Sequence, residues 1–183
     1  VEAPSVWTIG HGGLSEADFL ARLAEPGIDL VADVRAQPGS RRSPQFGGAA
    51  MAGWLGDNGV GYVRIPELAG RRRRQDVDPA LNAGWRNASF HNYADHMQGE
   101  EFAEGLSALA DLATEHRVAI MCGEPVPWRC HRMLIADALA SRGSDVVHLM
   151  PDGHGRLHEL GAWGAAPRLG ADGGLTYPGG VEP

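Results

Sequence analysis

The sequence contains no lysine, and all 16 of its basic residues are arginine. With 23 acidic residues the net charge is −7, so the chain lacks the overall positive charge that general DNA binding requires. The arginines are grouped, with Arg35, Arg41 and Arg42 in one cluster and Arg71–Arg74 in another. Because a guanidinium group binds a carboxylate or phosphate through two parallel hydrogen bonds, these clusters favour a small anion or a short stretch of nucleic-acid backbone as the partner.

The sequence also lacks any run of 18 apolar residues, so we expect no membrane span. Its first residues, Val1–Pro4, show no basic region followed by an apolar run, and we therefore expect no secretory signal. Only two cysteines are present, Cys122 and Cys130. Few cysteines without an export signal indicate free thiols in a reducing, cytoplasmic environment.

The alternation of apolar runs with amphipathic stretches predicts a three-layer α/β sandwich with a mostly parallel, Rossmann-like sheet. We expect a single α/β domain over residues 1–160 and a loosely held, Gly- and Pro-rich C-terminal tail over residues 161–183. Strands are expected at residues 6–9, 30–34, 62–65, 118–121 and 145–149. Helices are expected between Ser15 and Pro26 and at residues 49–58, 90–97, 100–116 and about 128–141.

Polar residues follow three of these strands. His11 follows the first strand, Asp33 and Arg35 end the second, and Cys122 and Glu124 end the strand at 118–121. In parallel α/β sheets, ligands bind beyond the carboxyl ends of the strands. We therefore predict a functional site at this edge of the sheet.

The densest group of reactive residues lies where the 118–121 strand passes into the next helix. Cys130, His131 and Arg132 are expected in the first helical turn, where unpaired N–H groups and the helix dipole attract anions. A thiol there tends toward the thiolate, and Arg132 can hold a carboxylate or phosphate. The alternative is a cysteine packed in the core and an Arg132 that pairs with Asp33.

The candidate catalytic residues are His11, Glu124, Cys122 and Cys130. His11 is either a base or anion donor, or a histidine with satisfied core hydrogen bonds. Glu124 is either a general acid or base, or a salt-bridge partner of Arg129 or Arg132. The candidate binding residues are Asp33, Arg35, Arg41, Arg42, Tyr93, His131 and Arg132.

Three other kinds of site fit the spacing poorly or only in part. A phosphatase loop needs five residues between Cys and Arg, but six separate Cys122 from Arg129, and Pro125 and Pro127 remove N–H donors. A metal site has suitable ligand types but no Cys-x-x-Cys pair. A redox pair requires a turn that brings Cys122 and Cys130 within disulfide reach.

Taken together, several short motifs resemble the domain of unknown function 488 family over roughly residues 6 to 149. This resemblance implies a compact α/β domain and no particular activity. The motifs are Thr8-Ile9-Gly10-His11, Asp33-Val34-Arg35, the loop 38–46, Pro66-Glu67-Leu68-Ala69-Gly70, Tyr93, Cys122-x-Glu124 and Cys130-His131-Arg132.

From these observations we predict an enzyme, a hydrolase or transferase, that binds an anionic, phosphate-bearing small molecule or nucleotide at the Cys-x-Glu/Cys-His-Arg site. The alternative is a metal- or thiol-based binding or sensing module, or a nucleic-acid accessory protein. Arg71–Arg74 either guide such a partner or form a solvated face. The residues identify no cofactor and no oligomeric state.

Overall fold

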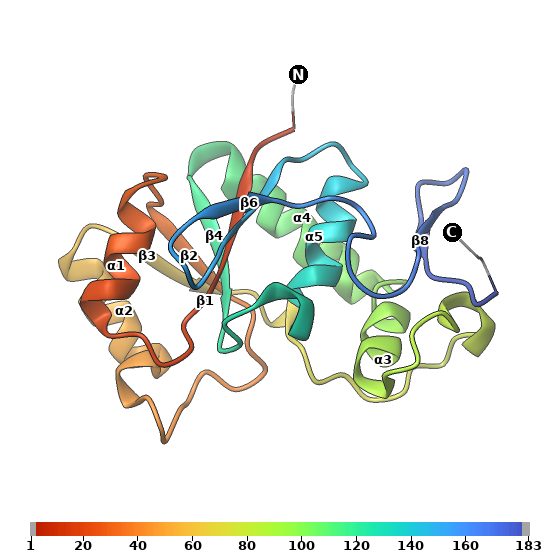
Figure 1. The fold of residues 1–183 in the computed structure, drawn as a ribbon, viewed down its shortest axis with the longest axis horizontal. Coiled ribbons are helices and arrows are strands. Elements are labelled where there is room, and N and C mark those ends of the chain that lie inside the picture. The colour runs from red at the N-terminus through yellow and green to blue at the C-terminus, as the bar shows by residue number, and fades with distance from the viewer. Residues whose placement is uncertain (1–2, 181–183) are drawn as a thin grey trace.

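The computed structural model describes residues 3–180, and a six-stranded sheet lies at its centre (Figure 1). The strand order is β3-β2-β4-β1-β5-β6. The first five strands in the chain are parallel, and β6 pairs antiparallel with β5. The strands are β1 (Val6–Gly10), β2 (Leu30–Asp33), β3 (Gly61–Arg64), β4 (Val118–Cys122), β5 (Val146–Leu149) and β6 (Gly155–Leu157). A separate two-stranded sheet pairs β7 (Arg168–Leu169) with β8 (Leu175–Thr176).

Helices cover both faces of the sheet, so the predicted three-layer α/β sandwich is confirmed (Figure 1). Strand β4 is buried on both faces of the sheet: Ala119 and Met121 belong to the core on one face, and Val118 and Ile120 to the core on the other. Because both faces are buried, its sequence is one continuous apolar run. Helices α1 (Glu16–Ala24) and α2 (Gly48–Asp57) pack on the first face, and α3 (Ala88–His96), α4 (Glu100–Glu115) and α5 (Arg132–Ala140) on the second.

The strand order brings the predicted strand-end residues together. β4 lies between β2 and β1, so the carboxyl ends of these three strands are neighbours. From β1 the chain crosses to β2 through α1 on one face, whereas from β4 it crosses to β5 through α5 on the other face. Connections that leave adjoining strands in opposite directions open a crevice at this edge of the sheet.

Helix α5 begins later than the sequence predicts. Residues Pro127–Arg129 form a short 3₁₀ turn, and Cys130 follows with an extended backbone, φ −139° and ψ 149°. The helix begins at Arg132. Cys130 is therefore not in the first helical turn, because Pro127 starts a separate turn that ends before the helix.

The C-terminal segment is more firmly packed than we expected. Leu175 and Tyr177 are buried in the main core, and the ring of Tyr177 lies 5.5 Å from that of Trp85. Asn82 Oδ1 also accepts a hydrogen bond of 2.9 Å from the Tyr177 backbone N–H. The expected loose tail is therefore wrong for this part of the chain, since its few apolar residues complete the core; residues 181–183 lie outside the described residues. No helix in the described part of the chain is long and apolar enough to cross a bilayer.

Candidate functional site

A cavity of about 620 Å³ opens at the carboxyl ends of β1, β2 and β4. Most of the candidate residues line it, and they come from five separate parts of the chain. Those that line the cavity are His11, Arg35, Arg42, Tyr93, Cys122, Glu124, Cys130 and His131. Three candidates do not line it, namely Asp33, Arg41 and Arg132.

The two thiols lie together at the cavity wall. Cys122 Sγ and Cys130 Sγ are 2.7 Å apart, and both side chains are buried, with exposed fractions of 4% and 5%. The backbone N–H of Arg132 donates to Cys130 Sγ at 3.4 Å. Burial opposes ionisation of Cys130, but the hydrogen bond from Cys122 and the adjacent Arg132 cation lower its pKa to about 6. Burial raises the pKa of Cys122, which is therefore the protonated partner that donates to the Cys130 thiolate.

Arg132 lies beneath the thiols and is fully buried, with an exposed fraction of 0%. Its Nη2 donates to the backbone oxygen of Glu124 at 2.6 Å and its Nη1 to Thr8 Oγ1 at 3.2 Å, while Nε has no hydrogen-bond partner. Among the described residues, no carboxylate forms an ion pair with it. Direct binding of a ligand by Arg132, which the sequence suggested, does not fit this position; the guanidinium instead supplies positive charge to the thiol pair.

His131 presents an unprotonated nitrogen to Cys130. Its Nε2–H donates to the backbone oxygen of Val34 at 2.8 Å, which leaves Nδ1 as an acceptor 3.5 Å from Cys130 Sγ. Burial lowers the pKa of His131, so the ring is neutral. The ring also packs on Gly70, where a Cβ atom would lie 2.7 Å from Nδ1, so glycine is needed at that position.

His11, like His131, lines the cavity and is held by a hydrogen bond to a backbone oxygen. Its Nδ1–H donates to the backbone oxygen of Gly12 at 2.8 Å, and its ring stacks on Phe46 with centroids 4.5 Å apart. Nε2 is then an acceptor, 3.4 Å from Nη1 of Arg35. Burial lowers the pKa of His11 below its ordinary value. A neutral imidazole at the cavity wall, whose Nε2 has only this long contact with Arg35 among the described residues, can accept a proton from a bound molecule.

Asp33 positions Arg35 rather than His11 or Arg132. Its carboxylate accepts hydrogen bonds from Nε and Nη2 of Arg35 at 3.0 and 2.8 Å. Tyr62 also donates to this carboxylate, at 2.5 Å from Oδ2, the oxygen that accepts from Nη2 of Arg35. Burial together with this bond raises the pKa of Tyr62 to about 12. Arg35 is thereby fixed at the cavity with its Nη1 free of the carboxylate.

The cavity rim is strongly cationic. Arg71 and Arg129 join Arg35 and Arg42, whereas Glu124 is the acidic side chain at the wall. Sequence reasoning did not single out Arg129, and treated Arg71 only as one of a run. The backbone of Arg71 has φ 57°, a conformation that non-glycine residues adopt rarely and that often marks functional sites.

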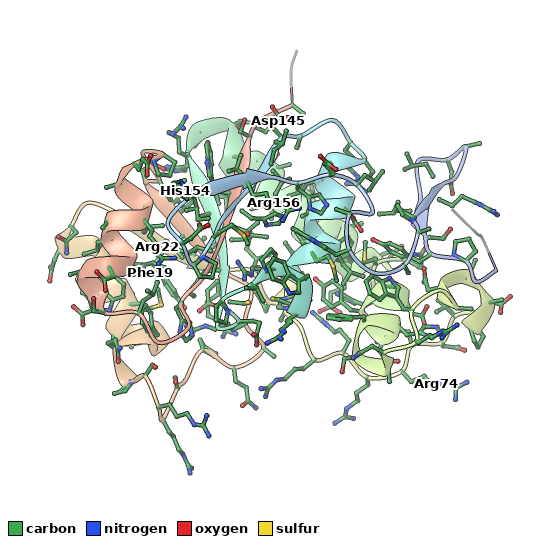
Figure 2. All side chains as sticks on the ribbon, viewed as in Figure 1. Phe19, Arg22, Arg74, Asp145, His154 and Arg156 are labelled. Carbon is green, nitrogen blue, oxygen red and sulfur yellow. The ribbon has the colours of Figure 1, made fainter. Side chains whose placement is uncertain are left out.

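The other members of the arginine run have different positions. Arg72 is tied to Glu101 at 2.9 Å and to the backbone oxygen of Ala69. Arg74 lies at the outer edge of the molecule on the side of α3 (Figure 2). Of the run 71–74, Arg71 alone lines the cavity. The Glu124 carboxylate forms no ion pair with either Arg129 or Arg132 in the part of the chain that the structure describes.

A buried chain of hydrogen bonds runs from Arg132 to Asp137, which both belong to α5. Thr8 Oγ1, which accepts from Arg132, donates to His148 Nδ1 at 2.7 Å. His148 Nε2–H then donates to His158 Nδ1 at 3.0 Å, and His158 Nε2–H donates to Asp137 Oδ1 at 2.7 Å. The chain therefore joins the buried guanidinium of Arg132 to the buried carboxylate of Asp137 through the Thr8 hydroxyl and two histidine rings.

No role was predicted for the residues of this buried chain, although two of them can be recognised in the sequence. Thr8 and His148 each interrupt an otherwise apolar strand, and the two are register partners across β1 and β5. Burial lowers the pKa of His148 to about 3, and His158 adds to this effect. Tyr177 completes the far end by donating to Asp137 Oδ2 at 2.6 Å. The C-terminal segment is thus linked to the guanidinium below the thiols.

Within residues 3–180, no three His, Cys, Asp or Glu side chains gather in a way that would hold a metal ion. No curated protein and no solved structure matches the chain. A family model described as domain of unknown function DUF488 matches residues 16–139, more than half of the chain. This match confirms the resemblance that the short motifs indicated. The chain belongs to the family described as domain of unknown function DUF488.

Proposed function

We propose that this protein is an enzyme that binds an anionic, phosphate-bearing small molecule or nucleotide in the arginine-rimmed cavity and attacks it with the Cys130 thiolate. The observation that carries the proposal is the burial of Arg132 without a carboxylate partner, directly beside Cys130. A buried cation requires a nearby negative charge. The Cys130 thiolate is the group that can supply it, and a thiolate is the reactive form of cysteine.

The rim supports the choice of an anionic substrate. Arg35, Arg42, Arg71 and Arg129 face the same hollow, and guanidinium groups bind phosphate oxygens in pairs. Phe90, also at the wall, offers an apolar surface on which a base ring can pack.

Two groups at the wall can move protons. Nε2 of His11, which has Arg35 Nη1 as a neighbour at 3.4 Å, is an acceptor, and the Glu124 carboxylate, without an ion-pair partner in the described residues, can take a proton from an attacking water. In the proposed reaction, the Cys130 sulfur displaces the leaving group, and the covalent adduct is passed to water or to a second molecule. The enzyme is then a hydrolase or a group transferase, respectively.

The rate at which iodoacetamide alkylates Cys130 as a function of pH tests the nucleophile. We expect the rate to follow an ionisation near pH 6, in keeping with the pKa of about 6 for Cys130, with the label located on Cys130 by peptide mass spectrometry. A profile of an ordinary thiol, with reaction only above about pH 8, would sink the proposal.

Protection against this alkylation tests the anion site. Inorganic phosphate and a panel of nucleotides should slow the labelling of Cys130 by occupying the cavity. Arg71→Gln should weaken the protection about threefold or more, because one charge-assisted contact is lost. Arg74→Gln is the matched control, since Arg74 does not line the cavity, and should leave the protection unchanged. Equal protection in both variants, or none in the wild type, contradicts the anion site.

A further inference from the structure

We propose that Cys122 and Cys130 work as a dithiol that reduces an anionic disulfide, with Cys130 as the attacking sulfur and Cys122 as the resolving sulfur. The inference rests on the proposed nucleophilic role of Cys130 and names the substrate class on which that role acts. It concerns Cys122, whose thiol the proposed transfer reaction does not require.

The two sulfur atoms are already nearly in bonding position. Their separation of 2.7 Å compares with about 2.05 Å for a disulfide bond. Cys122 ends β4 and Cys130 precedes α5, and the seven residues between them fold back through the 3₁₀ turn at Pro127–Arg129. Closing the bond requires a small movement of either side chain and no rearrangement of the sheet.

The surroundings of the two sulfurs differ in the way that such a reaction needs. Cys130 receives the Arg132 backbone N–H at 3.4 Å and lies beside the guanidinium, so its thiolate is stabilised. Cys122 is oriented toward the backbone oxygen of Glu124 at 3.9 Å, an acceptor that favours the protonated thiol. One sulfur is thus prepared for attack, while the other keeps its proton until the first step is complete.

The cavity selects the charge of the partner. Both sulfurs line a hollow whose rim carries four arginines, so a disulfide that bears carboxylates is attracted and a cationic disulfide is repelled. The volume of about 620 Å³ is sufficient for a small molecule rather than for a protein domain.

The reaction balances without another reagent. The Cys130 thiolate attacks one sulfur of R–S–S–R, which forms a Cys130–S–S–R mixed disulfide and releases R–S⁻. This thiolate takes the proton of Cys122, and the Cys122 sulfur then attacks Cys130 Sγ. The second R–S⁻ leaves, and the Cys122–Cys130 disulfide remains. The protein has lost two electrons, and the small disulfide has gained them as one thiol and one thiolate.

Oxidised glutathione, a disulfide that carries several carboxylates, is a suitable probe. The purified protein is incubated with mixtures of oxidised and reduced glutathione, quenched with acid, alkylated and weighed by intact mass spectrometry. We expect the wild type to lose both free thiols together as one two-electron couple, with no glutathione retained. Cys122→Ser should stall with one glutathione bound to Cys130, and Cys130→Ser should keep its single remaining thiol, Cys122, unreacted.

A comparison of partners tests the charge selection. Oxidation should be fastest with oxidised glutathione, slower with the neutral hydroxyethyl disulfide and slowest with the cationic disulfide cystamine. Arg71→Gln should reduce the ratio of the oxidation rates with the anionic and the cationic probe at least threefold, whereas Arg74→Gln should leave this ratio unchanged. Equal rates for anionic and cationic probes overturn the substrate class.

The alkylation and glutathione experiments together distinguish a failure of the dithiol role from a failure of the proposed function. If Cys130 alkylates as a thiolate and phosphate protects it, but the wild type stalls at the mixed disulfide as Cys122→Ser does, the dithiol role is wrong and the proposed function stands. If Cys130 is alkylated with the pH dependence of an ordinary thiol, both the proposed function and the dithiol role are wrong.

Discussion

Arg132 determines the chemistry of the cavity wall although no ligand in the cavity can touch it. Its side chain is enclosed by Thr8, the backbone of Glu124 and the thiols. A guanidinium keeps its charge in proteins, so in this enclosure it acts as a fixed positive charge for Cys130. This role differs from the direct anion contact that its place in the Cys-His-Arg motif suggested.

Replacement of Arg132 should therefore change the pKa of Cys130 and leave the residues that line the cavity in place. Arg132→Met keeps much of the side-chain volume but removes the charge and the donors, and we expect the pKa of Cys130 to rise from about 6 to its ordinary range. The thiolate fraction at neutral pH then falls about tenfold or more. Ultraviolet thiolate absorbance during a pH titration measures this change.

The same titration of Arg42→Met provides the control, because Arg42 lines the cavity and has no contact with the thiols. Its Cys130 should titrate as in the wild type. A low pKa retained in Arg132→Met would show that Cys122 and the backbone N–H of residue 132 stabilise the thiolate without the guanidinium.

The place of a residue at the edge of the sheet could be predicted from its position along a strand, whereas its role at the site stays a prediction. His11, Arg35 and Cys122 were predicted from the rule that parallel strands share a functional edge, and all three line the cavity. The surroundings of Arg132 could not be predicted, because its partner Thr8 lies 124 positions away in the sequence. Only the strand order, which brings β1 beside β4, decides that contact.

At the scale of elements, the end of β1 packs against the loop that follows β4. A Cβ atom at Gly10 would lie 1.8 Å from the backbone oxygen of Glu124, the same oxygen that accepts from Arg132. The close approach of these two backbones, which the absence of a side chain permits, fixes the carbonyl that holds the guanidinium.

Gly10→Ala should consequently disturb both stability and chemistry. We expect the free energy of unfolding to fall by about 2 kcal/mol or more, because the loop must move to admit the methyl group, and the pKa of Cys130 to rise. Urea unfolding and thiolate titration measure the two effects. Gly13→Ala, in the loop that follows β1 and with nothing within 4 Å of the added atom, should show neither effect; similar losses in both variants would contradict this account.

Thr8 connects two elements through its hydroxyl group. In Thr8→Val, Nη1 of Arg132 and Nδ1 of His148 lose their shared partner in the buried space between β1 and β5. We expect a loss of about 1–3 kcal/mol in the free energy of unfolding, the usual cost of unpaired buried polar groups. Thr114→Val, at an exposed helix position whose hydroxyl bonds only within its own helix, should change stability by no more than about 0.5 kcal/mol.

Element boundaries were predicted well where periodicity is strong and less well where proline interrupts it. Helix α4 and strand β4 lie close to their expected ranges because their apolar residues repeat clearly. The start of α5 was placed too early because Trp128 and Arg129 suit a helix locally, whereas Pro127 opens a separate turn. The three-layer arrangement itself followed from the alternation of strands and helices.

At the scale of the whole molecule, four histidines with a lowered pKa make the free energy of unfolding depend on pH. Burial lowers the pKa of His11, His96, His131 and His148 in the folded protein, whereas in the unfolded chain they titrate near the ordinary 6.5. Below that pH the unfolded chain binds protons that the folded protein does not, so acid favours unfolding. For His148 this penalty persists until the pH approaches about 3.

Urea unfolding between about pH 7.5 and pH 5 should reveal this dependence. Stability should fall as the pH is lowered across the whole range. Above about pH 6.5 it should fall by up to about 1.4 kcal/mol per pH unit, because the unfolded chain protonates Cys130 whereas the folded protein, with a pKa of about 6 for this thiol, does not. Below pH 6.5 each of these histidines should add up to about the same slope. A stability that stays constant or rises across this range would show that the histidines are protonated in the folded protein.

The family match and the folded unit have different extents. The match spans residues 16–139, whereas β1 and β5, which contribute Thr8 and His148, lie outside it. One of the two central strands of the sheet, β1, is therefore supplied by residues beyond the matched segment. So are three of the five residues of the buried chain from Arg132 to Asp137, namely Thr8, His148 and His158.

The buried chain that ends at Tyr177 has a consequence for biosynthesis. Translation delivers both thiols and Arg132 before it delivers His148, His158 and Tyr177. While those later residues are still in the ribosomal tunnel, β5 cannot pair with β1, so we expect the guanidinium to remain hydrated and the thiol to keep its ordinary acidity. We therefore expect the nascent polypeptide to gain its reactive sulfur only after β5 has docked.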